Sequence, residues 1–150
     1  MFTRQRVIII YGSTTGNTET LSKYVEKGLK ASGADAVVKN VTKANPEELK
    51  DYDVIILGSS TWGDGELQDD FIPFEEKMRK IRLDGKKGAV FGCGDSMYPQ
   101  FCKAVDILEK RLKSCGAQII IDSLKIDGDI EPELNKAEDW GKNLGEKLNK

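Results

Sequence analysis

An apolar run that passes directly into a glycine-containing polar loop narrows the possible folds of this chain more than any other feature. The run covers residues 7–11, and the loop covers residues 12–18, where Ser, Thr and Asn side chains surround two glycines. Leu21, Val25 and Leu29 follow at helical spacing. We therefore predict a buried strand, a tight loop and a helix whose N-terminus points its partial positive charge into the loop.

This loop has the chemistry of a phosphate site. Lys and Arg are absent from residues 12–18, so the loop suits a terminal monophosphate held by neutral donors rather than a triphosphate with Mg²⁺. It lacks both the Gly-Lys-Ser/Thr ending of a Walker loop and the Gly-x-Gly-x-x-Gly pattern of a dinucleotide fingerprint. The alternative is that its Ser, Thr and Asn side chains only cap the helix.

The composition excludes several classes of function. With 150 residues, 39% of them hydrophobic and 32% charged, the chain is typical of a soluble globular protein, and we expect residues 1–150 to form one domain in the cytoplasm. The absence of histidine excludes His-based triads, imidazole bases and His-ligated metals. A formal charge of −2 with dispersed basic residues predicts no nucleic-acid partner, and no apolar run is long enough for a membrane helix. The three cysteines, Cys93, Cys102 and Cys115, predict free thiols in a reducing compartment.

Apolar strand patterns alternate with helical patterns along the whole chain. Gly33 ends the first helix. We then expect strands at residues 36–41, 53–58, 88–92 and 118–121, and a short helix start at 45–48. Further helices are expected at residues 68–80, between the fourth strand and Gly116, and at the end of the chain, where Pro132 begins the closing helix. Such alternation predicts right-handed crossovers. The predicted fold class is α/β, a doubly wound five-stranded parallel sheet of order 2-1-3-4-5 between two layers of helices.

In doubly wound sheets, ligands bind beyond the carboxyl ends of the strands, where the strand order reverses. Three unusual loops fall at such ends, at residues 12–18, 59–70 and 93–102. Trp62 and Tyr98 lie in the second and third loops, where a core role is improbable, and we expect them to stack on a planar ligand. A planar ring joined by a polar chain to a monophosphate describes flavin mononucleotide, FMN.

Residues 13–18, 60–64, 66–71 and 91–96 together resemble the loops of the flavodoxin family. The resemblance spans essentially the whole chain, and with no insertion in the fifth strand it is similar to the short-chain flavodoxins, especially those of sulfate-reducing bacteria. It implies a flavodoxin-like three-layer sandwich and an electron-transfer protein, not an enzyme. Such a protein carries non-covalently bound FMN as a low-potential one-electron carrier that cycles between semiquinone and hydroquinone. Its partners would be redox proteins that meet the exposed flavin edge, and we expect a monomer with no membrane partner.

The same resemblance implies which residues hold the cofactor. Residues 13–18 would bind the phosphate, with Asn17, Ser60 and Thr61 along the ribityl chain, while the Trp62 and Tyr98 side chains flank the isoalloxazine. The backbones of Gly63, Asp64, Asp95 and Cys102 would meet the polar edge of the ring. The full expected set is Ser13, Thr14, Thr15, Gly16, Asn17, Thr18, Ser60, Thr61, Trp62, Gly63, Asp64, Cys93, Gly94, Asp95, Tyr98, Gln100, Phe101 and Cys102, with no catalytic residue and no metal ligand.

The chain departs from the family pattern at a few positions. Gly65, Pro99 and Gln100 stand where relatives often carry acidic or aromatic residues, and the overall charge is less negative than is common in the family. Acids near the flavin, among them Asp69 and Asp70, are expected to oppose the anionic hydroquinone. These departures bear on potentials and partner choice rather than on the identity of the cofactor.

Other functions remain as alternatives. An FMN-dependent quinone-type reductase would need a substrate pocket and a site for a hydride donor, and the sequence shows no second nucleotide motif. A phospho-acceptor signalling domain would need Asp at the end of the third strand, where Ser59 and Ser60 stand. A Cys-x₅-Arg phosphatase is excluded because Pro99 and Leu108 occupy the arginine positions.

Overall fold

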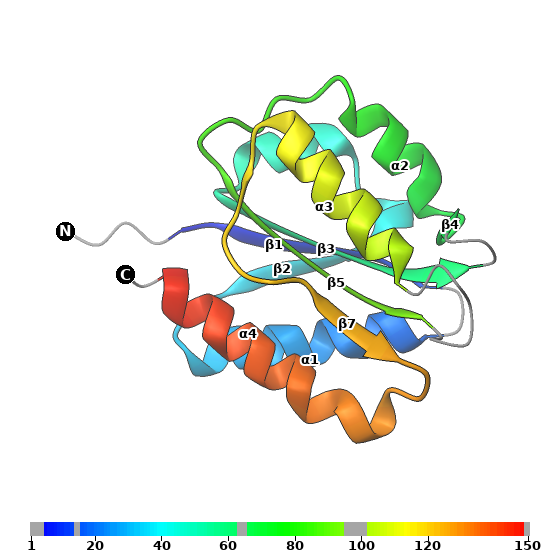
Figure 1. The fold of residues 1–150 in the computed structure, drawn as a ribbon. Coiled ribbons are helices and arrows are strands. Elements are labelled where there is room, and N and C mark those ends of the chain that lie inside the picture. The colour runs from blue at the N-terminus through cyan, green and yellow to red at the C-terminus, as the bar shows by residue number, and fades with distance from the viewer. Residues whose placement is uncertain (1–4, 14–15, 63–65, 95–101, 149–150) are drawn as a thin grey trace.

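The chain alternates strands and helices from end to end (Figure 1). The structure, a computed structural model, describes residues 5–13, 16–62, 66–94 and 102–148, with only the backbone of Trp62 and Glu66. No helix among these residues is long and apolar enough to cross a membrane. The elements are β1 (Val7–Gly12), α1 (Asn17–Ala31), β2 (Ala36–Asn40), η1 (Val41–Lys43), η2 (Pro46–Asp51), β3 (Val54–Trp62), β4 (Glu66–Leu67), α2 (Phe71–Met78), β5 (Lys87–Gly94), α3 (Lys103–Cys115), β6 (Gln118–Ile119), β7 (Leu124–Asp127), η3 (Glu131–Glu133) and α4 (Leu134–Leu148).

The central sheet is parallel and has the predicted order. β2, β1, β3 and β5 lie side by side, and the fifth position beside β5 is shared by β6 and β7. The prediction of one strand at residues 118–121 is therefore wrong in part, because β6 ends at Ile119 and a second strand begins at Leu124. The chain leaves the ladder between them, where the Asp122 carbonyl accepts a hydrogen bond from Trp140 Nε1 at 2.8 Å.

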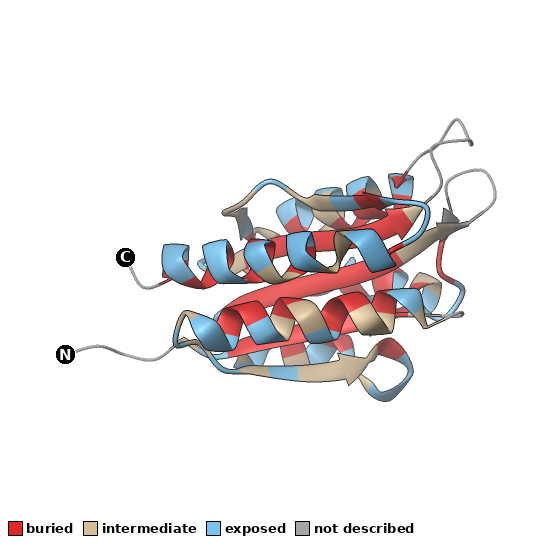
Figure 2. Cartoon of the chain, turned by 90° about the horizontal axis from the view of Figure 1, so that it is seen from below, coloured by how far each residue is buried: buried red, intermediate tan, exposed pale blue. Residues whose placement is uncertain are grey.

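Two apolar layers cover the two faces of this sheet. Ile8 and Ile10 of β1 pack into the cluster that includes α2 and α3, whereas Val7 and Ile9 pack into the cluster that includes α1 and α4. Figure 2 shows buried strands behind helices along which buried and exposed residues alternate. The sheet is thus apolar on both faces, as the continuous run at residues 53–58 predicts, because helices cover both of them.

Strand β3 continues further than its apolar run. The expected strand ends at residue 58, yet β3 runs on through Trp62, because Ser60 still pairs with Cys93 of β5. Residues 59–61 therefore lie on a strand and not in a loop. The expected helix at residues 68–80 is also shorter, since α2 covers only Phe71–Met78 with Asp70 as its N-cap.

Helices α1 and α4 meet through their backbones. A Cβ atom added at Gly28 of α1 would overlap the Glu138 carbonyl oxygen, and one added at Gly141 of α4 would overlap the Val25 carbonyl oxygen. Only residues without side chains permit this approach. The contact fixes the C-terminal half of α1 against α4, on the lower face of the sheet in Figure 1.

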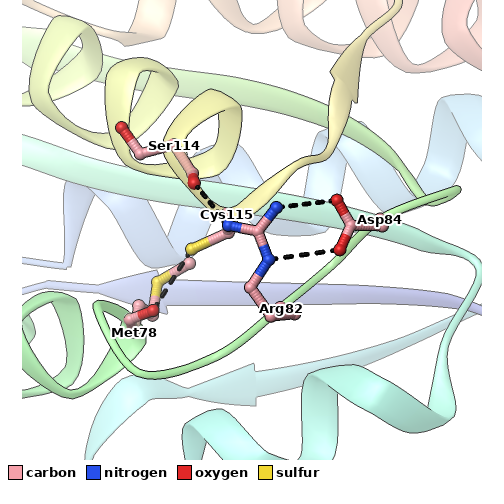
Figure 3. Close-up of polar contacts among 5 residues, drawn as sticks. All are labelled: Met78, Arg82, Asp84, Ser114 and Cys115. Carbon is pink, nitrogen blue, oxygen red and sulfur yellow. Dashed lines mark hydrogen bonds and ion pairs between the residues drawn. The ribbon is translucent and has the colours of Figure 1, made fainter.

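A polar cluster holds the C-terminal end of α3, near the start of β5 (Figure 3). Arg82 binds both carboxylate oxygens of Asp84, at 3.1 and 2.8 Å, and its Nη1 donates to the Ser114 carbonyl at 3.1 Å. The Cys115 thiol donates to the Met78 carbonyl at 3.2 Å. A cation on the last carbonyls of α3 complements the negative end of the helix.

Replacing Gly28 by alanine tests the close contact between α1 and α4. Helix propensity alone would make Gly28→Ala stabilising by about 1 kcal/mol. Because the new Cβ overlaps the α4 backbone, we expect the free energy of unfolding to fall by about 1–3 kcal/mol instead, measured by denaturant titration. Asn143→Ala, on the exposed side of α4, is the control and should stay within about 0.5 kcal/mol of the parent. Stabilisation by Gly28→Ala would contradict the packing.

Candidate functional site

The candidate site lies at the edge of the sheet where β1, β3 and β5 end. In the ladder Gly12 pairs with Ser59, and Ser59 pairs with Gly92. Below this row the strands are apolar, and beyond it each of the three strands leads into polar or small residues. Since neighbouring parallel strands have their carboxyl ends at the same edge, the three expected loops start side by side.

The first loop ends in a helix whose N-cap carries no side chain. Gly16 is the N-cap of α1 and has left-handed backbone angles, φ 92° and ψ −8°. The Ser13 hydroxyl accepts a hydrogen bond from Gly16 N at 3.0 Å, so it is used within the loop and does not cap the helix. Helix capping by Ser13 is therefore not observed. The first-turn N–H groups of Asn17 and Thr18 donate no hydrogen bond to an N-cap side chain, because Gly16 has none, and the positive end of α1 faces the loop.

Two side-chain contacts fasten the first turn of α1 to the sheet. Tyr11 Oη donates to Glu19 Oε2 at 2.9 Å, and burial together with the Glu19 carboxylate raises the pKa of the tyrosine. Thr18 Oγ1 lies 3.6 Å from Cys93 Sγ, and both side chains are buried. The start of α1 is thus fixed to β1 on one side and to β5 on the other.

The end of β3 is fixed by hydroxyl groups. Residues 61 and 62 pair with β4 as antiparallel strands. Ser59 Oγ accepts from Gln68 N at 3.1 Å and donates to the Ser60 carbonyl at 2.9 Å. Thr61 Oγ1 accepts from Ala104 N at 3.0 Å and therefore ties β3 to the first turn of α3.

The third segment is held at both of its ends. Gly94 ends β5, and its carbonyl accepts a hydrogen bond from Gly128 N at 2.7 Å. Cys102 precedes α3 in the left-handed region with φ 50°, which is unusual for a residue with a Cβ. Its thiol lies 3.8 Å from the Ile126 carbonyl. Gly94 is thus held by a hydrogen bond from Gly128, just after β7, and Cys102 lies against β7 at the N-terminus of α3.

The structure brings together those expected site residues that it describes. Ser13, Gly16, Asn17 and Thr18 follow β1, Ser60 and Thr61 lie on β3, Cys93 and Gly94 end β5, and Cys102 begins α3. The backbone of Trp62 ends β3. Thr14, Thr15, Gly63, Asp64, Asp95, Tyr98, Gln100 and Phe101 lie outside the described residues.

Several residues that hold this edge together were not identified from the sequence. Ser59 and Gln68 are buried polar side chains, with 0% and 1% of their surface exposed. Tyr11 of β1 and Glu19 of α1 form a hydrogen-bonded pair between a strand and a helix. Their spacing in sequence gives no signal of these contacts. Within the described residues, no cluster of three potential metal ligands was found.

The geometry defines the class of protein: a doubly wound α/β fold in which a loop without Lys or Arg leads into the N-terminus of α1, at the point where the strand order reverses. Comparison with known proteins then identifies the family within this class. The flavodoxin family profile matches residues 9–141, and the chain belongs to the flavodoxin family. Flavodoxins are FMN-binding electron carriers without a small-molecule substrate, which removes the support for a reductase.

Individual relatives are similar over nearly the whole chain. Flavodoxin of Maridesulfovibrio salexigens is 48% identical over 144 residues, covering 94% of this chain and 97% of that protein. Oxidised flavodoxin 2 of Bacillus cereus superimposes with a TM-score of 0.90 at 40% identity, covering 95% of this chain and 99% of that one. Fusobacterium nucleatum flavodoxin bound to flavin mononucleotide has a TM-score of 0.84 at 19% identity over 95% and 98% of the two chains, and supports the fold.

The environment of the three unpaired thiols predicts low reactivity. Burial raises the pKa of the Cys93 and Cys115 thiols, and it raises that of Cys102 to about 12, with Cys93 as the second cause. Since the thiolate is the nucleophile, we expect the native protein to resist iodoacetamide at about pH 8 and all three thiols to react in guanidinium chloride. Mass spectrometry counts the labels. Rapid native labelling of Cys93 or Cys102 would contradict their burial.

Proposed function

We propose that this chain is a low-potential one-electron carrier that binds FMN non-covalently where β1, β3 and β5 end. The observation that carries the proposal is the α1 N-terminus, which has no N-cap side chain and no basic residue in residues 12–18. Membership of the flavodoxin family supports the same cofactor. We further propose that residues 1–150 act as one monomeric domain in the cytoplasm and exchange electrons with redox proteins.

The phosphate end of FMN fits the first loop. At Gly16, with its left-handed backbone, an added Cβ would have no neighbour within 4 Å, so the space beside the loop is open. A phosphate there would take hydrogen bonds from backbone N–H groups and from hydroxyl and amide side chains such as Asn17 and Thr18. These donors are neutral and need no counter-ion, as expected for a terminal monophosphate.

The proposed place for the ring end of FMN is beside the end of β3 and the N-terminus of α3. Ser60 and Thr61 lie on β3, and Cys102 lies at the start of α3, which Thr61 itself fastens by its hydrogen bond to Ala104 N. The roles proposed for Trp62, Gly63, Asp64, Asp95, Tyr98, Gln100 and Phe101 rest on the family resemblance. In this arrangement the chain holds and orients the cofactor and excludes water from its inner edge.

When bound, FMN would supply the one-electron chemistry, with the semiquinone and hydroquinone as the working pair. The chain carries no His, and no reacting side chain is required of it. Acidic side chains near the ring are expected to disfavour a second negative charge there, and Asp69 and Asp70 before α2 are exposed acids of this kind. The proposed role of the protein is therefore to set potentials and to offer an edge to a partner.

Two glycines at opposite ends of α1 give a matched test of the phosphate loop. Gly16 and Gly33 have φ values of 92° and 91°, and neither has an atom within 4 Å of an added Cβ. Alanine costs roughly 1–2 kcal/mol in this conformation. We expect Gly16→Ala to weaken FMN binding about tenfold and riboflavin binding much less, because riboflavin lacks the phosphate.

Gly33→Ala is the control for this pair. Gly33→Ala should lower the midpoint of thermal unfolding by about as much as Gly16→Ala does. It should leave the FMN dissociation constant, measured by fluorescence titration, unchanged. Equal losses of FMN and riboflavin affinity in Gly16→Ala would contradict phosphate binding by this loop.

A reductive titration tests the electron-carrier proposal. The FMN-loaded protein, reduced stepwise under anaerobic conditions, should show an intermediate absorption spectrum that rises and then falls, because the two electrons enter at separate potentials. Assay of NAD(P)H oxidation with quinones should show no steady-state turnover by the protein alone. Direct two-electron bleaching together with quinone turnover would support the reductase instead.

A further inference from the structure

A buried glutamine lies where the chain returns from the β3–β4 hairpin toward α2. Gln68 has 1% of its surface exposed, and its environment joins two segments that are far apart in sequence. We infer that Gln68 is a positioning residue that couples the phosphate loop after β1 to the segment after β3. The inference rests on the proposed FMN site and assigns Gln68 no contact with the cofactor.

The carboxamide of Gln68 is held in one orientation. Its Nε2 donates to Asp70 Oδ2 at 2.9 Å, and its Oε1 accepts from Asp70 N at 3.0 Å. Because a backbone N–H can only donate, the second bond identifies the oxygen of the amide. A buried carboxamide must be hydrogen-bonded, and this pair of bonds also orders Asp70, the N-cap of α2.

The same carboxamide lies against the last residue of β1. A Cβ added at Gly12 would stand 2.5 Å from Gln68 Oε1 and 2.9 Å from the Phe71 ring, so this position has room only for glycine. Gly12 pairs with Ser59 in the sheet, and the Ser59 hydroxyl accepts from Gln68 N at 3.1 Å. Gln68 thus contacts the ends of both β1 and β3.

This contact links the positions of the two candidate loops to each other. Gly12 immediately precedes Ser13, whose hydroxyl accepts from Gly16 N in the phosphate loop. The segment that contains Gln68 follows directly on β4, which closes the hairpin of the second loop. A shift of Gln68 therefore disturbs the origin of the first loop and the base of the second together.

Gln68→Met tests the coupling without leaving a large cavity. Methionine keeps the length and approximate volume of glutamine but loses both hydrogen bonds to Asp70. We expect the FMN dissociation constant to rise about tenfold, as for the loss of a buried polar pair. Gln118→Met, at an exposed glutamine on β6, is the matched control and should leave FMN binding within about twofold.

Amide hydrogen exchange of the FMN-free protein separates coupling from local damage. In Gln68→Met, exchange should quicken in residues 13–19 as well as in residues 66–71, while residues 137–148 of α4 keep their protection. Quickening confined to residues 66–71, or an FMN dissociation constant within about twofold of the parent, would overturn the inference.

A second variant keeps the test decisive if Gln68→Met folds poorly. Asp70 is exposed, and Asp70→Ala removes only the acceptor of the Gln68 Nε2 bond. We expect it to weaken FMN binding about threefold, and the double variant to bind no more weakly than Gln68→Met. FMN binding and amide exchange in residues 13–19 that stay as in the parent when Asp70→Ala is tested alone would overturn the coupling, as would strictly additive losses where the double variant folds. If the parent protein takes up no FMN, the proposed function fails, and the exchange result alone still reports whether the two loops are joined.

Discussion

The in-register parallel pairing of β1, β3 and β5 is the constraint on which the rest of the structure depends. Since helices cover both faces of this sheet, strand residues on either side must be apolar, and polar chemistry can begin only beyond the last covered row. That row is Gly12, Ser59 and Gly92. Small residues here allow side chains from the returning segments to pack directly on the backbone. The position of the candidate site is therefore a property of the sheet as much as of the loops.

The strand order and the two helical layers could be predicted from the sequence, and so could the place of a loop between β1 and α1. Apolar runs such as residues 7–11 and 53–58 are long and continuous, so their burial is evident locally. The fifth strand was harder, because an edge strand has a ladder partner on one side only. Ile120 N still donates to the Gly88 carbonyl, at 3.2 Å, but two residues further on the Asp122 carbonyl accepts from Trp140 of α4 instead of from a strand.

The supporting contacts of the site could not be predicted for a similar reason. Residues 59–61 are polar and suggest a loop, yet they continue β3 because Ser60 pairs with Cys93 of the neighbouring strand. In the sequence, Gln68 looks like an ordinary polar residue before a helix. Only its position against Gly12 in the structure shows why it is buried. Local patterns report secondary structure and loop chemistry, whereas such contacts depend on pairing between distant segments.

The backbone contact between α1 and α4 bears on the thermodynamics of ligand binding. α1 carries backbone N–H groups at its N-terminus, next to the first loop, and its C-terminal half packs against the α4 backbone without intervening side chains. A helix held in this way cannot tilt or slide without breaking the contact. The donors at its N-terminus are therefore ordered during folding, before any ligand arrives. If the proposed phosphate site binds its anion, the free energy of binding would reflect mainly the ligand's own loss of freedom and the release of water, with little rearrangement of the protein.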